Sequence, residues 1–366
     1  MPTRPISFAR GAPSLDIIDV DGLSAAATRA FAEDPAGATA YGTSIGYVPL
    51  RRWIAERHGV DESQVLVTNG SMQADAFLFD ELVGPGKEVV VERPTYDRTL
   101  LALGQRGATI HAVDLEHDGI DTTALAKLIA GGARPSLAHI IPTFQNPAGY
   151  TLSLAKRHEL LRLAANHGFV IFEDDPYIAL RFTGEDVPSM LSLDDGGHVI
   201  YASSFSKTIC PGIRVGYLVG EAGMIKKIAA RATSTYISPN MVAQSIVHQF
   251  CLSGALDRSI ETVKAALSQR ADALGHALGR ELPGASFVKP EGGYFMWVTL
   301  PPGLDAGALV AACAERGVIV LPGTDFMLDG GSDALRLAYS GVTPAQIEDG
   351  VVLIGEAARS LGVAAV

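Results

Sequence analysis

The chain has 366 residues, of which 48% are hydrophobic and 19% are charged, and its formal net charge is −11. This length predicts either one large domain with a smaller one or two domains of comparable size. The sequence contains no apolar run of about 18 residues, which argues against a membrane span. The acidic charge argues against a nucleic-acid partner, because such proteins gather Lys and Arg on one face.

The N-terminal residues include arginines but no apolar segment of signal-peptide length, so we expect a cytoplasmic protein. The cysteines, Cys210, Cys251 and Cys313, are widely spaced. This spacing indicates reduced thiols rather than a zinc site. We therefore expect no metal in the functional site.

Short β-branched runs alternate with helical patterns through the first two thirds of the chain. The expected strands are residues 65–68, 88–92, 138–143, 169–173, 198–203 and 213–220. Between two of them, residues 152–168 place Leu154, Leu160 and Ala164 on one face of a helix. The alternation predicts an α/β fold with a mainly parallel sheet between helices, and ligands collect at the carboxyl ends of such strands.

The pattern changes at Met241, where a long helical run begins and Gly- and Pro-marked strands follow. We interpret this last third as a smaller α+β domain hinged on the long helix, with the first residues of the chain packing beside it. The predicted divisions are an N-terminal segment at 1–39, a large domain at 40–250 and a small domain at 251–366.

Lys207 stands in "YASSFSKTICPGIRVGYLVG", between an expected strand and a Pro-Gly turn. A lysine that is desolvated or close to other cations has a lowered pKa and can form a Schiff base with a carbonyl. A lone lysine is more often a solvated loop residue. Ser204, Ser206 and Arg214 favour the first interpretation, because hydroxyls and a planar cation are suited to a phosphate dianion.

A second candidate phosphate site is Gly70 and Ser71 in "VTNGSMQ", where an expected strand ends and a helix begins. Free N–H groups at a helix start bind anions, although Gly-Ser at this position is more often only a cap. Two independent phosphate sites around one lysine favour the binding interpretation.

Polar residues also follow two other expected strands. Glu173, Asp174 and Asp175 end one of them, and because strand side chains alternate, at least one carboxylate should enter the site. A solvated acidic turn is the alternative. Asn146 in "PTFQNPAG" is either simple turn chemistry or a neutral donor for a phenolate oxygen.

Taken together with "YGTSIG", "ERPTY", "FARGAPS" and "ALRLAYS", these motifs resemble the fold-type I pyridoxal-phosphate (PLP) aminotransferases of classes I and II. They are closest to the 2-aminoadipate, kynurenine and aromatic amino acid subgroup. The resemblance runs from Phe8 to Leu361 and implies a seven-stranded type of sheet and a homodimer. It also implies transfer of the amino group of an L-amino acid to a 2-oxo acid, with 2-oxoglutarate as the expected acceptor.

The resemblance implies catalytic roles for Lys207, Asp174 and Tyr177. Lys207 would form the Schiff base with PLP and then move a proton, and Asp174 would pair with the pyridine nitrogen and keep the ring an electron sink. Tyr177 would hydrogen-bond the ring's phenolate oxygen. The other implied cofactor contacts are Gly70, Ser71, Met72, Tyr96, Asn146, Ser204, Ser206, Arg214 and, from the other subunit, Tyr41. The implied substrate contacts are Arg336, which would clamp the α-carboxylate, Gly11 and Asn146.

Met72 departs from the family pattern, which often has Gln there, so one phosphate contact would be lost or replaced by backbone. Other PLP reactions, such as β- or γ-elimination, cyclisation or oxidative decarboxylation, use the same Lys207, Asp174 and Arg336 and stay open. A third alternative is the effector half of a GntR-type regulator. We disfavour it, because the charge is acidic and the match begins close to Met1.

Overall fold

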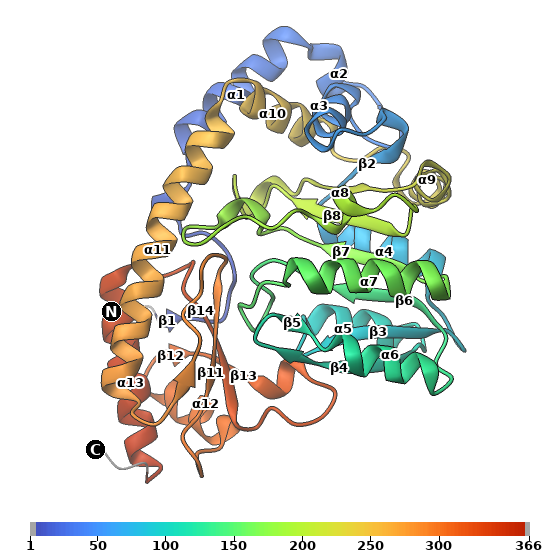
Figure 1. Ribbon diagram of the computed structural model, residues 1–366. Helices are drawn as coiled ribbons and strands as arrows, with labels where there is room; N and C mark the ends of the chain where they lie inside the picture. Colours follow the sequence, from blue (N-terminus) through green and yellow to red (C-terminus); the bar gives the residue numbers. More distant parts are fainter. Residues whose placement is uncertain (1–4, 363–366) are drawn as a thin grey trace.

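A mainly parallel β-sheet forms the centre of the larger part of the computed structural model, which describes residues 5–362 (Figure 1). The strand order is β2 (Val65–Thr68), β9 (Gly216–Val219), β8 (Val199–Ser204), β7 (Val170–Asp174), β6 (Pro135–Ile140), β3 (Glu88–Arg93), β4 (Thr109–Glu116) and β5 (Gly119–Ile120). The strands from β8 to β4 are parallel, whereas β9 is antiparallel to both of its neighbours. The two-residue β5 adds an antiparallel edge to the expected seven strands.

Apolar side chains on both faces explain why these runs form buried strands. In β3, Val89 and Val91 pack on one face and Val90 packs on the other. The helices against the first face are α4 (Ser71–Leu82), α5 (Asp97–Gln105) and α9 (Ala222–Tyr236). Those against the second face are α6 (Thr122–Ala130), α7 (Leu154–His167) and α8 (Met190–Leu193). This arrangement of helices around a sheet confirms the predicted fold class.

The structure differs from the sequence-based expectation in detail. The sequence analysis missed β4, whose side chains are mostly only half-buried or exposed, so that its apolar signal is weak. The long helical run from Met241 is two helices, α10 (Met241–Leu252) and α11 (Ala255–Glu281). They are separated at Gly254, which has φ +69°, a conformation that glycine adopts easily.

The smaller part of the molecule packs on the far half of α11, which runs along both parts (Figure 1). Its antiparallel sheet has the order β10 (Ser286–Phe287), β11 (Phe295–Thr299), β14 (Ala334–Ala338) and β13 (Leu321–Pro322). Helices α12 (Ala306–Glu315) and α13 (Pro344–Ser360) complete it. Arg336 of the central strand β14 thereby lies between Trp297 of β11 and Leu321 of the edge strand β13.

The N-terminal residues join both parts of the molecule. Strand β1 (Ile6–Ser7) pairs in parallel with β12 (Val318–Ile319), and Phe8 is fully buried in the core of the smaller part. Farther on, α1 (Val20–Glu33) and α2 (Pro35–Thr39) pack against α10, beside α3 (Val48–His58). The domain divisions at 39/40 and 250/251 stay a prediction, and their outermost residues, 1–4 and 363–366, lie outside the described range. No helix within residues 5–362 has both the length and the apolar character to cross a bilayer.

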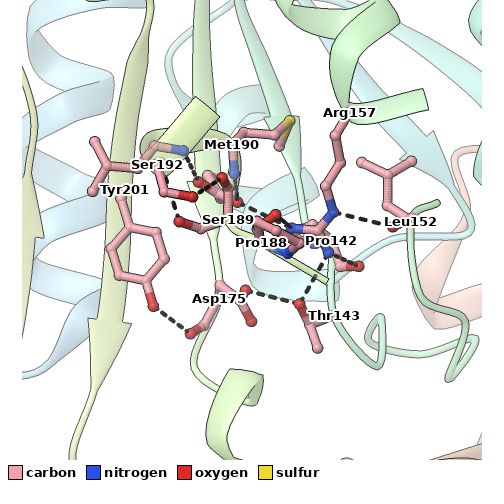
Figure 2. A network of polar contacts seen from close by, with 12 residues as sticks. Pro142, Thr143, Leu152, Arg157, Asp175, Pro188, Ser189, Met190, Ser192 and Tyr201 are labelled. Atoms are coloured by element: carbon pink, nitrogen blue, oxygen red, sulfur yellow. Dashed lines mark hydrogen bonds and ion pairs between the residues drawn. The ribbon is translucent and has the colours of Figure 1, made fainter. Parts of the chain in front are cut away.

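A buried polar network holds the loops that follow β6 and β7 (Figure 2). The guanidinium of Arg157, in α7, is fully buried and donates to backbone carbonyls of both loops and to the hydroxyl of Thr143. Thr143 donates in turn to Asp175 at 2.8 Å, and Glu173 lies 3.5 Å from Arg157. Burial raises the pKa of Glu173 to about 7 and that of Asp175 to about 8. The network therefore depends on the arginine as its buried cation.

Replacement of Arg157 by Met should lower the free energy of unfolding by about 3–5 kcal/mol, because buried acceptors would lose their cation. Urea unfolding followed by circular dichroism measures this loss. Arg162→Met is the matched control on the same helix, since Arg162 is exposed and its one ion pair among residues 5–362 is with Glu159. Its effect should stay within about 0.5 kcal/mol. Equal stability of the two variants would contradict the assignment.

Candidate active site

A cavity of about 490 Å³ lies where the carboxyl ends of the central strands meet the smaller part of the molecule. The predicted site residues on its wall are Gly11, Ser71, Met72, Tyr96, Asn146, Asp174, Tyr177, Ser204, Ser206, Lys207, Arg214 and Arg336. Gly70 adjoins this wall through Arg214. Tyr41 does not line the cavity: it lies beside a separate pocket near α2 and α3, and its side chain is 87% exposed.

Lys207 follows β8 and places its amine in the middle of this wall. Its Nζ donates to the carbonyl of Gly11 at 2.6 Å and lies 5.8 Å from the centre of the Tyr177 ring. Burial lowers the pKa of Lys207 to about 8. Asp174 opposes this shift, whereas Arg336 and other nearby cations add to it. The amine is therefore able to lose its proton near neutral pH, as a nucleophile or base must.

The three acids that end β7 point in alternate directions. Asp174 faces the cavity, while Glu173 and Asp175 belong to the network of Arg157 behind it. On β6, the fully buried His139 has its Nε2 3.5 Å from Asp174 Oδ2. His139 is thus placed to orient the carboxylate. The sequence analysis missed it, because a histidine within an apolar strand looks like a core residue.

Backbone and hydroxyl groups gather at the other end of the cavity. Gly70 is the N-cap of α4, and no side chain caps the helix there. A Cβ at Gly70 would lie 2.2 Å from Nη2 of Arg214, so a larger residue would clash with the guanidinium. Arg214 Nη1 donates to the hydroxyl of Ser206 at 3.3 Å, and Ser206 N donates to Ser204 Oγ at 3.1 Å. A helix start, hydroxyls and a guanidinium in one corner fit a phosphate group.

Met72 lies at the rim of the cavity. Its side chain is 48% exposed, and its sulfur accepts a hydrogen bond from the hydroxyl of Tyr96 at 3.9 Å. Burial raises the pKa of Tyr96 to about 12, so this hydroxyl keeps its proton and stays a donor. Met72 stands where the family often has Gln. In this chain its side chain contacts the hydroxyl of Tyr96 and offers no hydrogen-bond donor to a phosphate.

Arg336 forms the opposite wall from β14. Its guanidinium lies 4.6 Å from the ring centres of both Phe295 and Phe326, and Nη1 donates to Asn146 Oδ1 at 3.2 Å. Nη2 donates to the carbonyl of Ala9. Within the described chain, the buried Nε has no partner. A fixed, stacked guanidinium with an unused donor is suited to a carboxylate.

Several residues in or beside the cavity wall were not predicted. Phe295 and Phe326 hold Arg336, and Tyr294 donates its hydroxyl to the carbonyl of Lys207 at 2.6 Å. Asp75 lines the wall one helical turn after Ser71. An acidic residue within the otherwise apolar stretch "ADAFLF" is the one signal in the sequence that could have pointed to it.

The wall fits PLP, with a phosphate corner, an amine of lowered pKa, a buried carboxylate and a stacked arginine around one space. Fold and site together define a PLP-dependent enzyme of fold type I. Residues 5–354 match the family "Aminotransferase class I and II", and the chain belongs to that family.

Its relatives support the same assignment. The chain is 34% identical to a 2-aminoadipate transaminase of Thermus thermophilus, over 97% of this chain and 90% of the relative. It is 33% identical to aromatic-amino-acid aminotransferase 1 of Thermococcus litoralis, over 96% and 87%. The crystal structure of the T. thermophilus alpha-aminoadipate aminotransferase, complexed with N-(5'-phosphopyridoxyl)-L-leucine, superposes with a TM-score of 0.93, 33% identity and coverage of 98% and 92%. The chain is a PLP-dependent aminotransferase.

The amine of Lys207 in the apoprotein should become reactive as the pH rises through about 8, because below this pKa it is protonated. Trace labelling with acetic anhydride across a pH series, read by peptide mass spectrometry, measures this midpoint. Asp174→Asn should move the midpoint downward, since the carboxylate stabilises the ammonium form. A midpoint near about 10.4, the ordinary value for lysine, would contradict this assignment.

Proposed function

We propose that this aminotransferase carries an amino group from an L-amino acid to a 2-oxo acid, with 2-oxoglutarate as acceptor, through a covalent link between PLP and Lys207. The observation that carries the proposal is the convergence of Lys207, Asp174 and Arg336 on one cavity. Each comes from a different part of the fold, so their meeting is not a consequence of sequence proximity.

Bound PLP supplies the electron sink for chemistry at the substrate's Cα. Asp174, supported by His139, provides the negative charge that favours a protonated ring nitrogen. Gly70, Ser71, Ser204, Ser206 and Arg214 would hold the phosphate. The predicted contacts of Tyr177 and Asn146 with the phenolate oxygen, and of Tyr96 with the ring face, belong to the same proposal.

Arg336 would bind the α-carboxylate of the substrate. Its stacking between Phe295 and Phe326 fixes the plane of the guanidinium, and the free Nε supplies a donor. A guanidinium that cannot rotate sets which bond of Cα faces the cofactor. Lys207 Nζ then removes the Cα proton, a task for which a pKa of about 8 is suited.

A screen of L-amino acids with 2-oxoglutarate, read by mass spectrometry, tests this function. Aromatic amino acids and 2-aminoadipate come first, because enzymes acting on them are relatives of this chain. We expect a 2-oxo product and glutamate in equal amounts. Lys207→Ala should abolish turnover and should not be labelled when borohydride reduces the PLP-loaded protein. Products of elimination, cyclisation or decarboxylation without glutamate would replace transamination by another PLP reaction.

We also propose a cytoplasmic homodimer that acts on small molecules, with no nucleic-acid or membrane partner, in which Tyr41 contributes to the partner's site. In the single chain this large ring is 87% exposed and does not reach the cavity. Met72, at the cavity rim, is also exposed. A second copy covering the rim would bury both side chains, and symmetric dimers are the commonest assembly.

Subunit mixing tests the role of Tyr41. Lys207→Ala and Tyr41→Ala homodimers should each have little activity. The mixture obtained by unfolding and refolding the two together should regain about a quarter of the wild-type activity, because about half of its dimers are hybrids and each hybrid has one intact site of two. Mixing without unfolding is the control. A mixture no more active than its parents would show that Tyr41 serves its own subunit.

A further inference from the structure

Asp75 is a buried acid of the cavity that the reaction described above does not use. It lies in α4 four residues after Ser71, and therefore on the same face of the helix, and it lines the same cavity. The residue is only 8% exposed, and its Oδ1 has no hydrogen-bond partner within residues 5–362. A polar atom in this position costs free energy unless a ligand supplies the missing partner.

The groups around Asp75 come from several elements. Asp174 stands at the end of β7, His139 lies behind Asp174 on β6, and Tyr96 precedes α5. The cations that line the cavity are Lys207 and Arg214, which follow β8, Arg336 of β14, Arg10 and Arg98, and Asp97 is a further acid on the same wall. Burial, together with the charge of Asp174, raises the pKa of Asp75 well above its ordinary value.

Two carboxyls in one buried site do not both ionise easily, and the one with the better partners keeps the charge. Asp174 has His139 at 3.5 Å and interacts with the ammonium of Lys207. Within the described residues, Asp75 forms no ion pair and its pKa shift has no cationic contribution. The proton therefore belongs on Asp75 and the charge on Asp174.

We propose that Asp75 is a further cofactor-contacting residue. It acts as an uncharged carboxylic acid, and its unpartnered carboxyl oxygen forms a hydrogen bond with the PLP held in this cavity. This inference rests on the proposed binding of PLP by Lys207 and Asp174. Asp75 would add a neutral polar group around the PLP ring, while Asp174 remains the anionic carboxylate of the site.

Asp75→Asn and Asp75→Leu separate the two possible roles of the carboxyl. Asn keeps a neutral polar group of the same size, whereas Leu removes it. At pH 6.5 the apoproteins of wild type and Asp75→Asn should bind PLP equally well, and Asp75→Leu should bind about five- to tenfold more weakly, as expected for a lost hydrogen bond. Quenching of intrinsic fluorescence measures these affinities.

The pH dependence of apoprotein stability gives a second measurement. A raised pKa means that the native state binds a proton that the unfolded state has released, so wild type should lose stability relative to Asp75→Asn as the pH rises above 3.8. Melting temperatures across pH 4–9 check this. Asp175→Asn is the matched control. Asp175 is a buried acid with a pKa raised to about 8, but it does not line the cavity. Asp175→Asn should show the same stability trend, and its PLP affinity should fall by much less than that of Asp75→Leu, because its carboxyl does not face the cavity.

The outcomes are distinct. If Asp75→Asn weakened PLP binding as much as Asp75→Leu, the carboxyl would act as an anion and the proposal would be overturned. If folded Asp75→Leu bound PLP like wild type, Asp75 would make no contact with the cofactor. Because the readout is binding rather than turnover, neither result depends on whether the enzyme transaminates or catalyses another PLP reaction.

Discussion

The alternation of side chains at the end of β7 is the constraint on which the site depends. Glu173, Asp174 and Asp175 are consecutive acids, and a strand must send the middle one to the face opposite its neighbours. Only Asp174 is free for the cavity. The other two need a buried cation behind the strand, and Arg157 supplies it (Figure 2). Asp174, the carboxylate proposed to act on PLP, can thus face the cavity while the two other acids are bound behind the strand.

The same network also places other parts of the site. The loop after β6 carries Asn146, and Arg157 binds the carbonyl of Pro142 within that loop. Asn146 then accepts from Arg336, which comes from the smaller part of the molecule. The loop after β6 therefore connects the buried network of Arg157 to Arg336, the residue proposed to hold the substrate. The N-terminal residues add to these contacts, since Ala9 and Gly11 accept from Arg336 and Lys207.

Motifs that combine a turn with a strand end were predictable from the sequence. Lys207 and Asp174 each follow a β-branched run, and parallel strands bring such ends to one edge of a sheet. His139 carried no signal in the sequence, and Asp75 carried only that of an acid within an apolar stretch, because the roles of both depend on which face of a strand or helix meets the cavity. Strand β4 was missed because its exposed, mixed side chains lack an apolar run. The proposed role of Tyr41 rests on the family resemblance, because it requires a second chain and cannot be read from the contacts of one subunit.

The charges of the cavity also argue for an uncharged Asp75. Its wall carries the cations Arg10, Arg98, Lys207, Arg214 and Arg336 and, besides Asp75, the acids Asp97 and Asp174. The resulting positive surplus suits a phosphate monoester, which carries a charge of about −1.5 to −2, followed by a substrate carboxylate. An ionised Asp75 would reduce this surplus just where anions must enter. An uncharged acid keeps the attraction for both anions and still offers a hydrogen bond, which accounts for a carboxyl being tolerated in a site built to bind negative charge.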